Sequence, residues 1–257
     1  MPKSFYRRGP DHRAGVPATF LDVRRRFGFR TVEIGRWVTE PEKARSATLF
    51  YDALCDLMVN LGGTETLISL RGTLALQYGI GGQPGVSAHY TPATRSFALA
   101  KNAGPGSIAH EWFHAFDHYI ADKLFGKPPR GAFGSTLWLT RDDPIDHPLN
   151  QRLQACYKAV LLNSAGTEPS ELFRQSAKAD RAAGVQYFSQ PEELCARAFE
   201  AFVQDAECKN AFLVKGTRES EEAKLGLYPQ DEQRQRINAA FQDYFSSLGR
   251  ALQRTGS

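Results

Sequence analysis

Two histidines and a glutamate near the middle of the chain have the spacing of a metal site. His110, Glu111 and His114 form the pattern His-Glu-x-x-His. Residues i and i+4 of a helix lie on one face, so the two imidazoles can reach the same ion. Zinc accepts nitrogen and carboxylate ligands in a tetrahedral arrangement, and a catalytic site leaves one position for water. The pattern therefore predicts a helix that holds one zinc ion per chain.

The glutamate of this pattern predicts the chemistry that the metal would support. Water bound to zinc becomes nucleophilic near neutral pH, and Glu111 projects toward the ion, where it can take the proton from that water. The resulting hydroxide would attack a peptide carbonyl, and Glu111 would pass its proton to the leaving amine. Further along the helix, Asp117 could accept a hydrogen bond from a ligand imidazole, or it could be a solvated or capping acid.

A third ligand has to come from another segment. The predicted helix over residues 191–205 carries acids among apolar and small residues. Glu193 and Glu200 are seven positions apart, so they share a helical face with Arg197. Either carboxylate could complete the metal site, and an ordinary amphipathic helix with solvated acids would show the same periodicity.

The metal-binding segment lies in an apolar stretch that should form a buried helix. This helix is predicted from Ser107, a plausible N-cap, to about Leu124. Two buried histidines and a glutamate would be costly without a partner, which also favours a bound metal. Further helical patterns cover four other parts of the chain, residues 41–61, 149–164, 191–205 and 231–253.

Short apolar or alternating runs before this helix predict a small sheet. They are separated by glycines and prolines and lie at residues 31–35, 67–70, 73–78, 86–90 and 97–100. The run at 86–90 could be an edge strand that pairs with an extended substrate. His89 in this run could approach the cleft, although a surface or core histidine is the simpler interpretation.

These patterns predict one α+β domain. Its small, mostly antiparallel sheet should pack on the active-site helix, and additional helices should follow at the C-terminal end. Residues 1–26 are expected to form a basic irregular arm and residues 27–257 the single domain, of which 149–257 is helical. The irregular stretch 126–148 is long enough to be a lid.

The composition excludes a disordered chain and a membrane-spanning one. The chain has 42% hydrophobic residues and no run of about 18 uncharged apolar residues. No apolar signal stretch follows the N-terminus, so the expected location is the cytoplasm. There the four cysteines should be reduced and mostly buried.

Positive charge is concentrated near the start of the chain. Residues 1–37 contain nine basic and three acidic residues, whereas the whole chain has a net charge of only +4. A basic arm of this kind could contact DNA or an acidic partner. A solvated terminus is the simpler explanation, because one basic cluster is a weak signal.

Two stretches resemble the anthrax lethal factor family of zinc peptidases, which use two histidines and one downstream glutamate. They are residues 110–119 and residues 187–199. The resemblance implies a zincin-like fold, Glu193 as the third ligand and Tyr187 as a donor to the oxyanion. The chain departs from the family one turn beyond the ligand glutamate, where it has Arg197 in place of an acid. An acid follows instead at Glu200, which competes with Glu193 as the ligand.

A second resemblance is to a domain found in large polyvalent proteins of phages and plasmids, over about residues 27–205. It implies a bacterial or mobile-element protein and a predicted peptidase. The main function hypothesis is therefore a zinc-dependent endopeptidase that cleaves a protein or peptide substrate, with Glu111 as general base. The alternative is a catalytically silent zincin-like module that binds DNA or a protein partner. A third interpretation is a structural domain that binds no metal.

Overall fold

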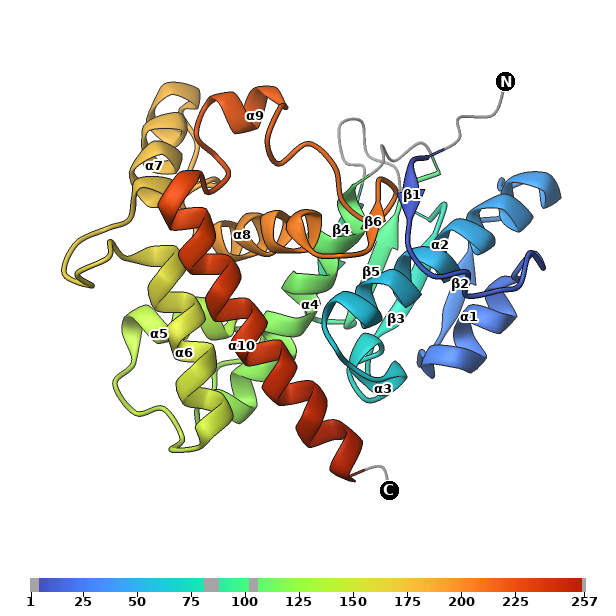
Figure 1. Ribbon diagram of the computed structural model, residues 1–257, viewed down its shortest axis with the longest axis horizontal. Coiled ribbons are helices and arrows are strands. Elements are labelled where there is room, and N and C mark those ends of the chain that lie inside the picture. The colour runs from blue at the N-terminus through green and yellow to red at the C-terminus, as the bar shows by residue number, and fades with distance from the viewer. Residues whose placement is uncertain (1–4, 81–87, 102–105, 256–257) are drawn as a thin grey trace. The chain divides into compact units, whose positions relative to one another are not determined.

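The computed structural model describes residues 5–80, 88–101 and 106–255. This part of the chain is α+β, mainly helices with one small mixed sheet (Figure 1). Contacts divide the chain into two units. The first comprises residues 1–115, 206–215 and 249–257, and the second comprises residues 116–205 and 216–248.

The sheet of the first unit has four strands. Their order is β2 (Val32–Ile34), β3 (Ala75–Tyr78), β5 (Ser96–Leu99) and β4 (Ala88–Thr91). The pairs β2–β3 and β3–β5 are parallel, and only β4 runs antiparallel to β5. The prediction of a mostly antiparallel sheet was therefore wrong. The reason is the helical connection between β2 and β3, which returns the chain to the same end of the sheet.

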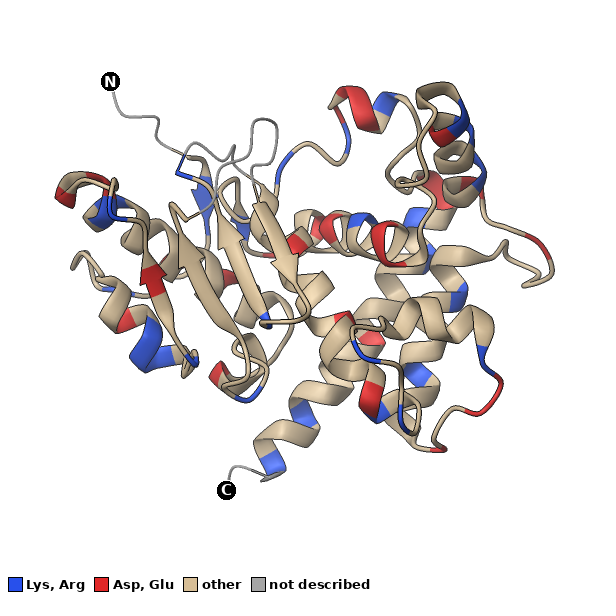
Figure 2. Ribbon diagram, turned by 180° about the vertical axis from the view of Figure 1, so that it is seen from behind, with Lys and Arg blue, Asp and Glu red and all other residues tan. Residues whose placement is uncertain are grey.

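Helices α1 (Phe20–Phe27) and α2 (Glu40–Asn60) pack together on one face of this sheet (Figures 1 and 2). The rings of Phe20 and Phe50 lie 5.7 Å and 5.8 Å from that of Tyr78 on β3. Ser46 on α2 donates to the Tyr78 hydroxyl at 2.7 Å. These contacts join both helices to the sheet through one aromatic cluster.

Helix α1 corrects the expectation of an irregular arm over residues 1–26. Thr19 and Asp22 form a capping box at its start, and Phe20, Val23 and Phe27 form a buried stripe. The three arginines of its last turn, visible as a blue band in Figure 2, mask this stripe in the sequence. Gly28 ends the helix in the left-handed region, at φ 72°.

The beginning of the chain is also bound to the first unit. Strand β1 (Arg7–Arg8) pairs antiparallel with β6 (Lys209–Asn210). The buried carboxylate of Asp56 accepts two hydrogen bonds from Arg7, at 2.7 and 2.8 Å, and one from Asn210 at 2.8 Å. Residues 7–13 are therefore not a free arm.

The apolar run at residues 67–70 is not a strand. It lies in α3 (Glu65–Ile68) and the turn that follows, where Leu70 and Arg71 have positive φ values of 52° and 56°. The predicted strand at 86–90 is confirmed as β4 from Ala88 onward, and residues 86–87 lie outside the described part of the chain.

The second unit is helical. Its elements are α5 (Gly134–Thr140), α6 (Pro148–Leu161), α7 (Glu171–Ala183), α8 (Pro191–Asp205) and α9 (Glu221–Lys224), together with the second half of α4 (Ser107–Leu124) and most of α10 (Asp231–Thr255). Helix α8 is buried from Glu193 to Val203 and contacts α5, α6 and α7. The helices predicted at 191–205 and 107–124 are confirmed with these bounds. Helices α5 and α7 were not predicted.

All four cysteines are buried and free, as expected. Burial raises the pKa of the Cys55 thiol to about 12. Among the described helices, none combines the length and apolar character that a membrane span requires.

Candidate metal centre

Helix α4 carries His110, Glu111 and His114, and its first turn is fixed by neighbouring backbone. The N–H of Gly106 donates to the carbonyl of Phe212 at 3.2 Å, and that of Ala109 donates to Leu213 at 3.1 Å. These bonds satisfy two of the donors that a helix start leaves open. Gly106 has φ 108°, and a Cβ there would lie 2.8 Å from the nitrogen of Lys215, so a side chain would be strained.

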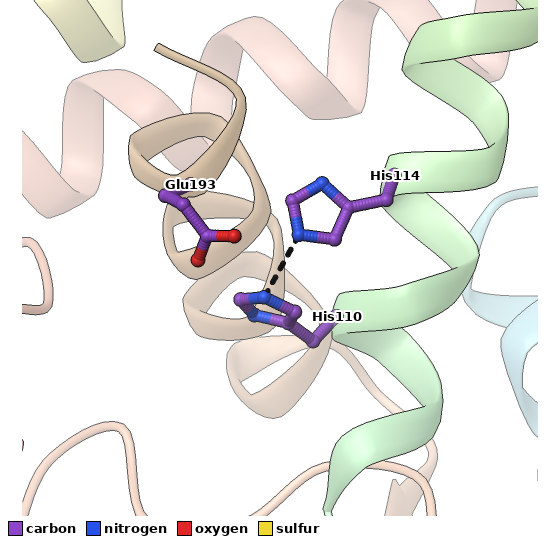
Figure 3. Close-up of side chains that lie close together, drawn as sticks. All are labelled: His110, His114 and Glu193. Carbon is purple, nitrogen blue, oxygen red and sulfur yellow. Dashed lines mark hydrogen bonds between the residues drawn. The ribbon is translucent and has the colours of Figure 1, made fainter. Parts of the chain in front are cut away.

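The two imidazoles converge on one point (Figure 3). Their Nε2 atoms are 3.0 Å apart, and their ring centroids are 4.6 Å apart in a T-shaped arrangement. Two nitrogens bound to one tetrahedral zinc at about 2.05 Å would lie about 3.3 Å apart. The rings therefore need to move by only a few tenths of an ångström to share an ion.

Glu193 on α8 is the acid that lies with these histidines. Ligand atoms of His110, His114 and Glu193 all lie within 4.8 Å of one another, and Figure 3 shows the carboxylate beside the two rings. Glu193 is 6% exposed and His114 is 7% exposed. Glu200 does not belong to this group, so the geometry favours Glu193 over Glu200 as the third ligand.

The donor set fits zinc. Two imidazole nitrogens and one carboxylate oxygen are the ligands of many zinc hydrolases, and they leave one tetrahedral position open. Calcium and magnesium prefer oxygen ligands alone. The residues therefore suit zinc, or another first-row metal that accepts imidazole.

Helix α5 links the helix of His114 to the helix of Glu193 inside the second unit. Asp117, one turn beyond His114, accepts hydrogen bonds from the Ser135 backbone and hydroxyl at 3.0 and 2.5 Å. The next residue, Thr136, donates to Glu192 on α8 at 2.7 Å. This run of hydrogen bonds starts three residues after His114 and ends on Glu192, the neighbour of Glu193.

Asp117 is fully buried, and its carboxylate also accepts a hydrogen bond from the hydroxyl of Tyr157 at 2.6 Å. The bond from the Ser135 backbone satisfies one of the open N–H donors at the start of α5. Asp117 therefore caps the start of α5, a helix other than its own. Burial and the nearby Asp117 charge raise the pKa of Tyr157 well above its usual value, so Tyr157 remains a donor.

The remaining predicted site residues lie in other surroundings. Glu200 accepts a hydrogen bond from the Tyr228 hydroxyl at 3.2 Å, and Arg197 lies between the rings of Phe188 and Tyr228. His89 is exposed on the edge strand β4 and is not part of the metal-ligand group. This agrees with its interpretation as a surface histidine.

Tyr187 lies in the loop before α8, and its side chain is 43% exposed. The loop is held by Asp180 of α7, which accepts from the backbone of Tyr187, Phe188 and Ser189 at 3.0, 2.8 and 2.9 Å. Burial alone would raise the pKa of Asp180, but the hydrogen bonds from Ser189 and from the backbone lower it below its usual value. Sequence reasoning missed Asp180, because α7 itself was not predicted.

A family model described as "Large polyvalent protein-associated domain 1" matches residues 179–252. This range contains the Tyr187 loop, α8 and most of α10, and therefore includes Glu193 but not α4. The predicted resemblance to large polyvalent proteins, over about residues 27–205, is therefore supported only where the two ranges overlap, at residues 179–205, and the match extends beyond the predicted range to residue 252. No curated protein and no solved structure matches the chain.

Proposed function

We propose that the chain is a zinc-dependent endopeptidase with a zincin-like catalytic fold. The observation that supports this proposal is the grouping of His110, His114 and Glu193 around one point, with Glu111 on the same helix as the two histidines. A histidine pair of this spacing with a glutamate after its first member is the pattern of metallopeptidases. The resemblance to the lethal factor family points to the same ligands.

Each residue of the proposed site has its own role in the reaction. His110, His114 and Glu193 hold the metal, which when bound lowers the pKa of water and polarises a substrate carbonyl. Glu111 is 8% exposed and adjacent to His110, so it accepts the proton of the attacking water. It then carries this proton to the amine that leaves when the peptide bond breaks.

Tyr187 is the proposed donor to the developing oxyanion. Its backbone is fixed by Asp180, so the loop that carries the ring has a defined path into α8. A phenol in this role acts by hydrogen bonding to negative charge that develops in the transition state. Tyr187 is 43% exposed, so a substrate could reach this residue.

The decisive experiment combines metal content with cleavage of an unfolded protein such as casein. Glu111→Gln should retain stoichiometric zinc and lose about 10²–10⁴-fold in kcat. His114→Ala should lose both zinc and cleavage. Asp122→Asn is a matched control on the same helix, because Asp122 pairs with Lys123 and is not part of the metal-ligand group. Cleavage at the wild-type rate by Glu111→Gln would overturn the general-base assignment.

Zinc binding without any cleavage would favour the silent module, in which the fold binds DNA or a protein partner. A DNA contact would use the arginines that remain exposed, such as Arg24 and Arg25 on α1. Arg7 and Arg13 are already paired with Asp56 and Asp52. A salt-dependent mobility shift that disappears in a double Arg24→Gln and Arg25→Gln variant would support this alternative.

A further inference from the structure

Arg197 is a buried charge that the proposed catalytic steps do not use. It is 7% exposed and lies on α8, one helical turn after Glu193. In the described part of the chain, no hydrogen bond or ion pair is found for its guanidinium, and its Nε is fully covered. A buried guanidinium with five N–H donors normally has acceptors, because leaving such donors unmet is costly.

Two aromatic rings hold this guanidinium in place. Its central carbon lies 5.1 Å from the centroid of the Phe188 ring and 5.6 Å from that of Tyr228. Such contacts stabilise a cation through the faces of the rings. They provide no hydrogen-bond acceptor for the N–H groups, which point outward in the plane of the guanidinium. Both rings are half-buried, so this cluster lies near the surface.

The nearest acid on the same helix is already engaged. Glu200 follows Arg197 by one turn, and its carboxylate accepts a hydrogen bond from the Tyr228 hydroxyl at 3.2 Å. Burial and the Glu200 charge raise the pKa of Tyr228, so this hydroxyl keeps its proton. Tyr228 therefore holds Glu200 with its hydroxyl and supports Arg197 with its ring.

We propose that Arg197, held between Phe188 and Tyr228, binds a carboxylate of the peptide substrate. The inference rests on the proposed function, because it gives the same site a substrate class. A guanidinium is suited to a carboxylate, which it can bind through two parallel hydrogen bonds. The carboxylate comes from an acidic side chain of the substrate or from its C-terminus.

The helix sets how far this carboxylate lies from the bond that is cleaved. Four residues of helix separate Glu193 from Arg197, a rise of about 6 Å. An extended peptide advances about 3.3 Å per residue. A peptide that runs along this part of α8 would therefore place its carboxylate about two positions from the scissile bond. The substrate class is a peptide with an acidic residue, or a free C-terminus, at that distance.

The test uses the full chain with Glu111→Gln, supplied with one equivalent of zinc, so that peptides bind without being cleaved. Three peptides are compared: acetyl-Ala-Asp-Ala-amide, acetyl-Ala-Asn-Ala with a free carboxylate, and the neutral acetyl-Ala-Asn-Ala-amide. Binding is followed by the Nε–Hε signals of ¹⁵N-labelled arginines. The Arg197 signal is assigned by its loss in Arg197→Lys.

At least one charged peptide should shift the Arg197 signal and bind about tenfold or more tightly than the neutral peptide. The peptide that does so identifies the source of the carboxylate. Arg197→Gln should abolish this preference, whereas Arg174→Gln, which removes an exposed arginine paired with Glu171, should retain it. Equal binding of all three peptides to protein with native Arg197 would overturn the inference.

The inference and the proposed function can fail separately. Cleavage of casein at bonds without a nearby carboxylate would leave the peptidase proposal standing and remove the role of Arg197. Conversely, a charged peptide could bind at Arg197 while the wild-type protein, with Glu111, cleaves nothing. That result would support the role of Arg197 and contradict the peptidase proposal.

Discussion

The hydroxyl and the backbone N–H of Ser135 both donate to the carboxylate of Asp117, at 2.5 and 3.0 Å. This pair connects α4 with α5 in the second unit, and Thr136 extends the connection to Glu192 on α8. The proposed ligands on α4 and α8 therefore depend on a short helix that touches neither the metal nor the substrate in the proposed mechanism.

Replacing the carboxylate of this pair should destabilise the protein. Asp117→Asn should lower the free energy of unfolding by about 2–3 kcal/mol, because buried donors of Ser135 and Tyr157 lose a charged acceptor. Thermal unfolding followed by circular dichroism measures the change. Asp122→Asn, at a half-exposed position of the same helix, is the control and should change little. Equal melting temperatures for the two variants would contradict the assigned role of Asp117.

The contact between α4, α5 and α6 also requires a glycine at position 134. A Cβ on Gly134 would lie 2.7 Å from the hydroxyl of Tyr157 and 3.1 Å from a carboxylate oxygen of Asp117. Gly134→Ala should therefore lower the free energy of unfolding by about 1–3 kcal/mol through overpacking. Gly126→Ala provides a matched comparison, because a Cβ there meets nothing within 4 Å. A Gly134→Ala protein as stable as Gly126→Ala would show that the contact is looser than described.

The bond between α5 and α8 should influence metal affinity. Thr136→Val removes the hydroxyl that donates to Glu192, the neighbour of the proposed ligand Glu193. We expect zinc affinity to fall by a factor of a few up to about tenfold, as for groups that orient a ligand from outside the metal shell. Competition with a chromogenic chelator measures the affinity. Thr140→Val should bind zinc normally, because the Thr140 hydroxyl bonds only to carbonyls of its own helix in the described structure.

Asp205 at the end of α8 should make stability depend on pH in the acidic range. Burial alone would raise the pKa of Asp205, but hydrogen bonds from Arg234, Asn238 and Arg218 lower it to about 2. A carboxyl with a lowered pKa in the folded state stabilises the protein above its unfolded pKa, near 3.8. This contribution, about 2 kcal/mol, is lost as pH falls from about 4 to 2.

Urea unfolding of wild type and Asp205→Asn at several pH values tests this dependence. The variant should be less stable at pH 7, and the difference between the two proteins should shrink below pH 4. A difference that stays constant from pH 7 to pH 2 would show that the Asp205 charge is not the cause.

The proposed metal-binding helices could be predicted from the sequence because their signals are local. Pro191 opens α8 and its apolar residues recur at helical spacing, so the bounds at Pro191 and Asp205 were both predicted. The position of Glu193 beside the histidines was reached through a family resemblance. Periodicity alone left Glu193 and Glu200 equivalent, because both are on the buried face of α8.

The missed elements depend on partners far away in the sequence. Helix α5 is short and contains two threonines, and part of its N-terminal capping comes from Asp117. Strand β5 lies between β3 and β4, an order that local alternation does not encode. The binding of residues 7–13 to the first unit could not be predicted from the sequence either. Arg7 pairs with Asp56, which is 49 residues away on α2, and the amphipathic pattern of α2 does not indicate this partner.

The carbonyls of Phe212 and Leu213, which receive the first N–H groups of α4, have a consequence for biosynthesis. A nascent chain that ends before this segment has the histidines but lacks two acceptors that complete their helix. Such a chain also lacks Glu193 for much of its synthesis, because Glu193 is translated 79 residues after His114. The proposed metal site would therefore be completed late in translation, after the segment at 212–213 has been added, so the proposed peptidase would stay inactive while the chain is still growing.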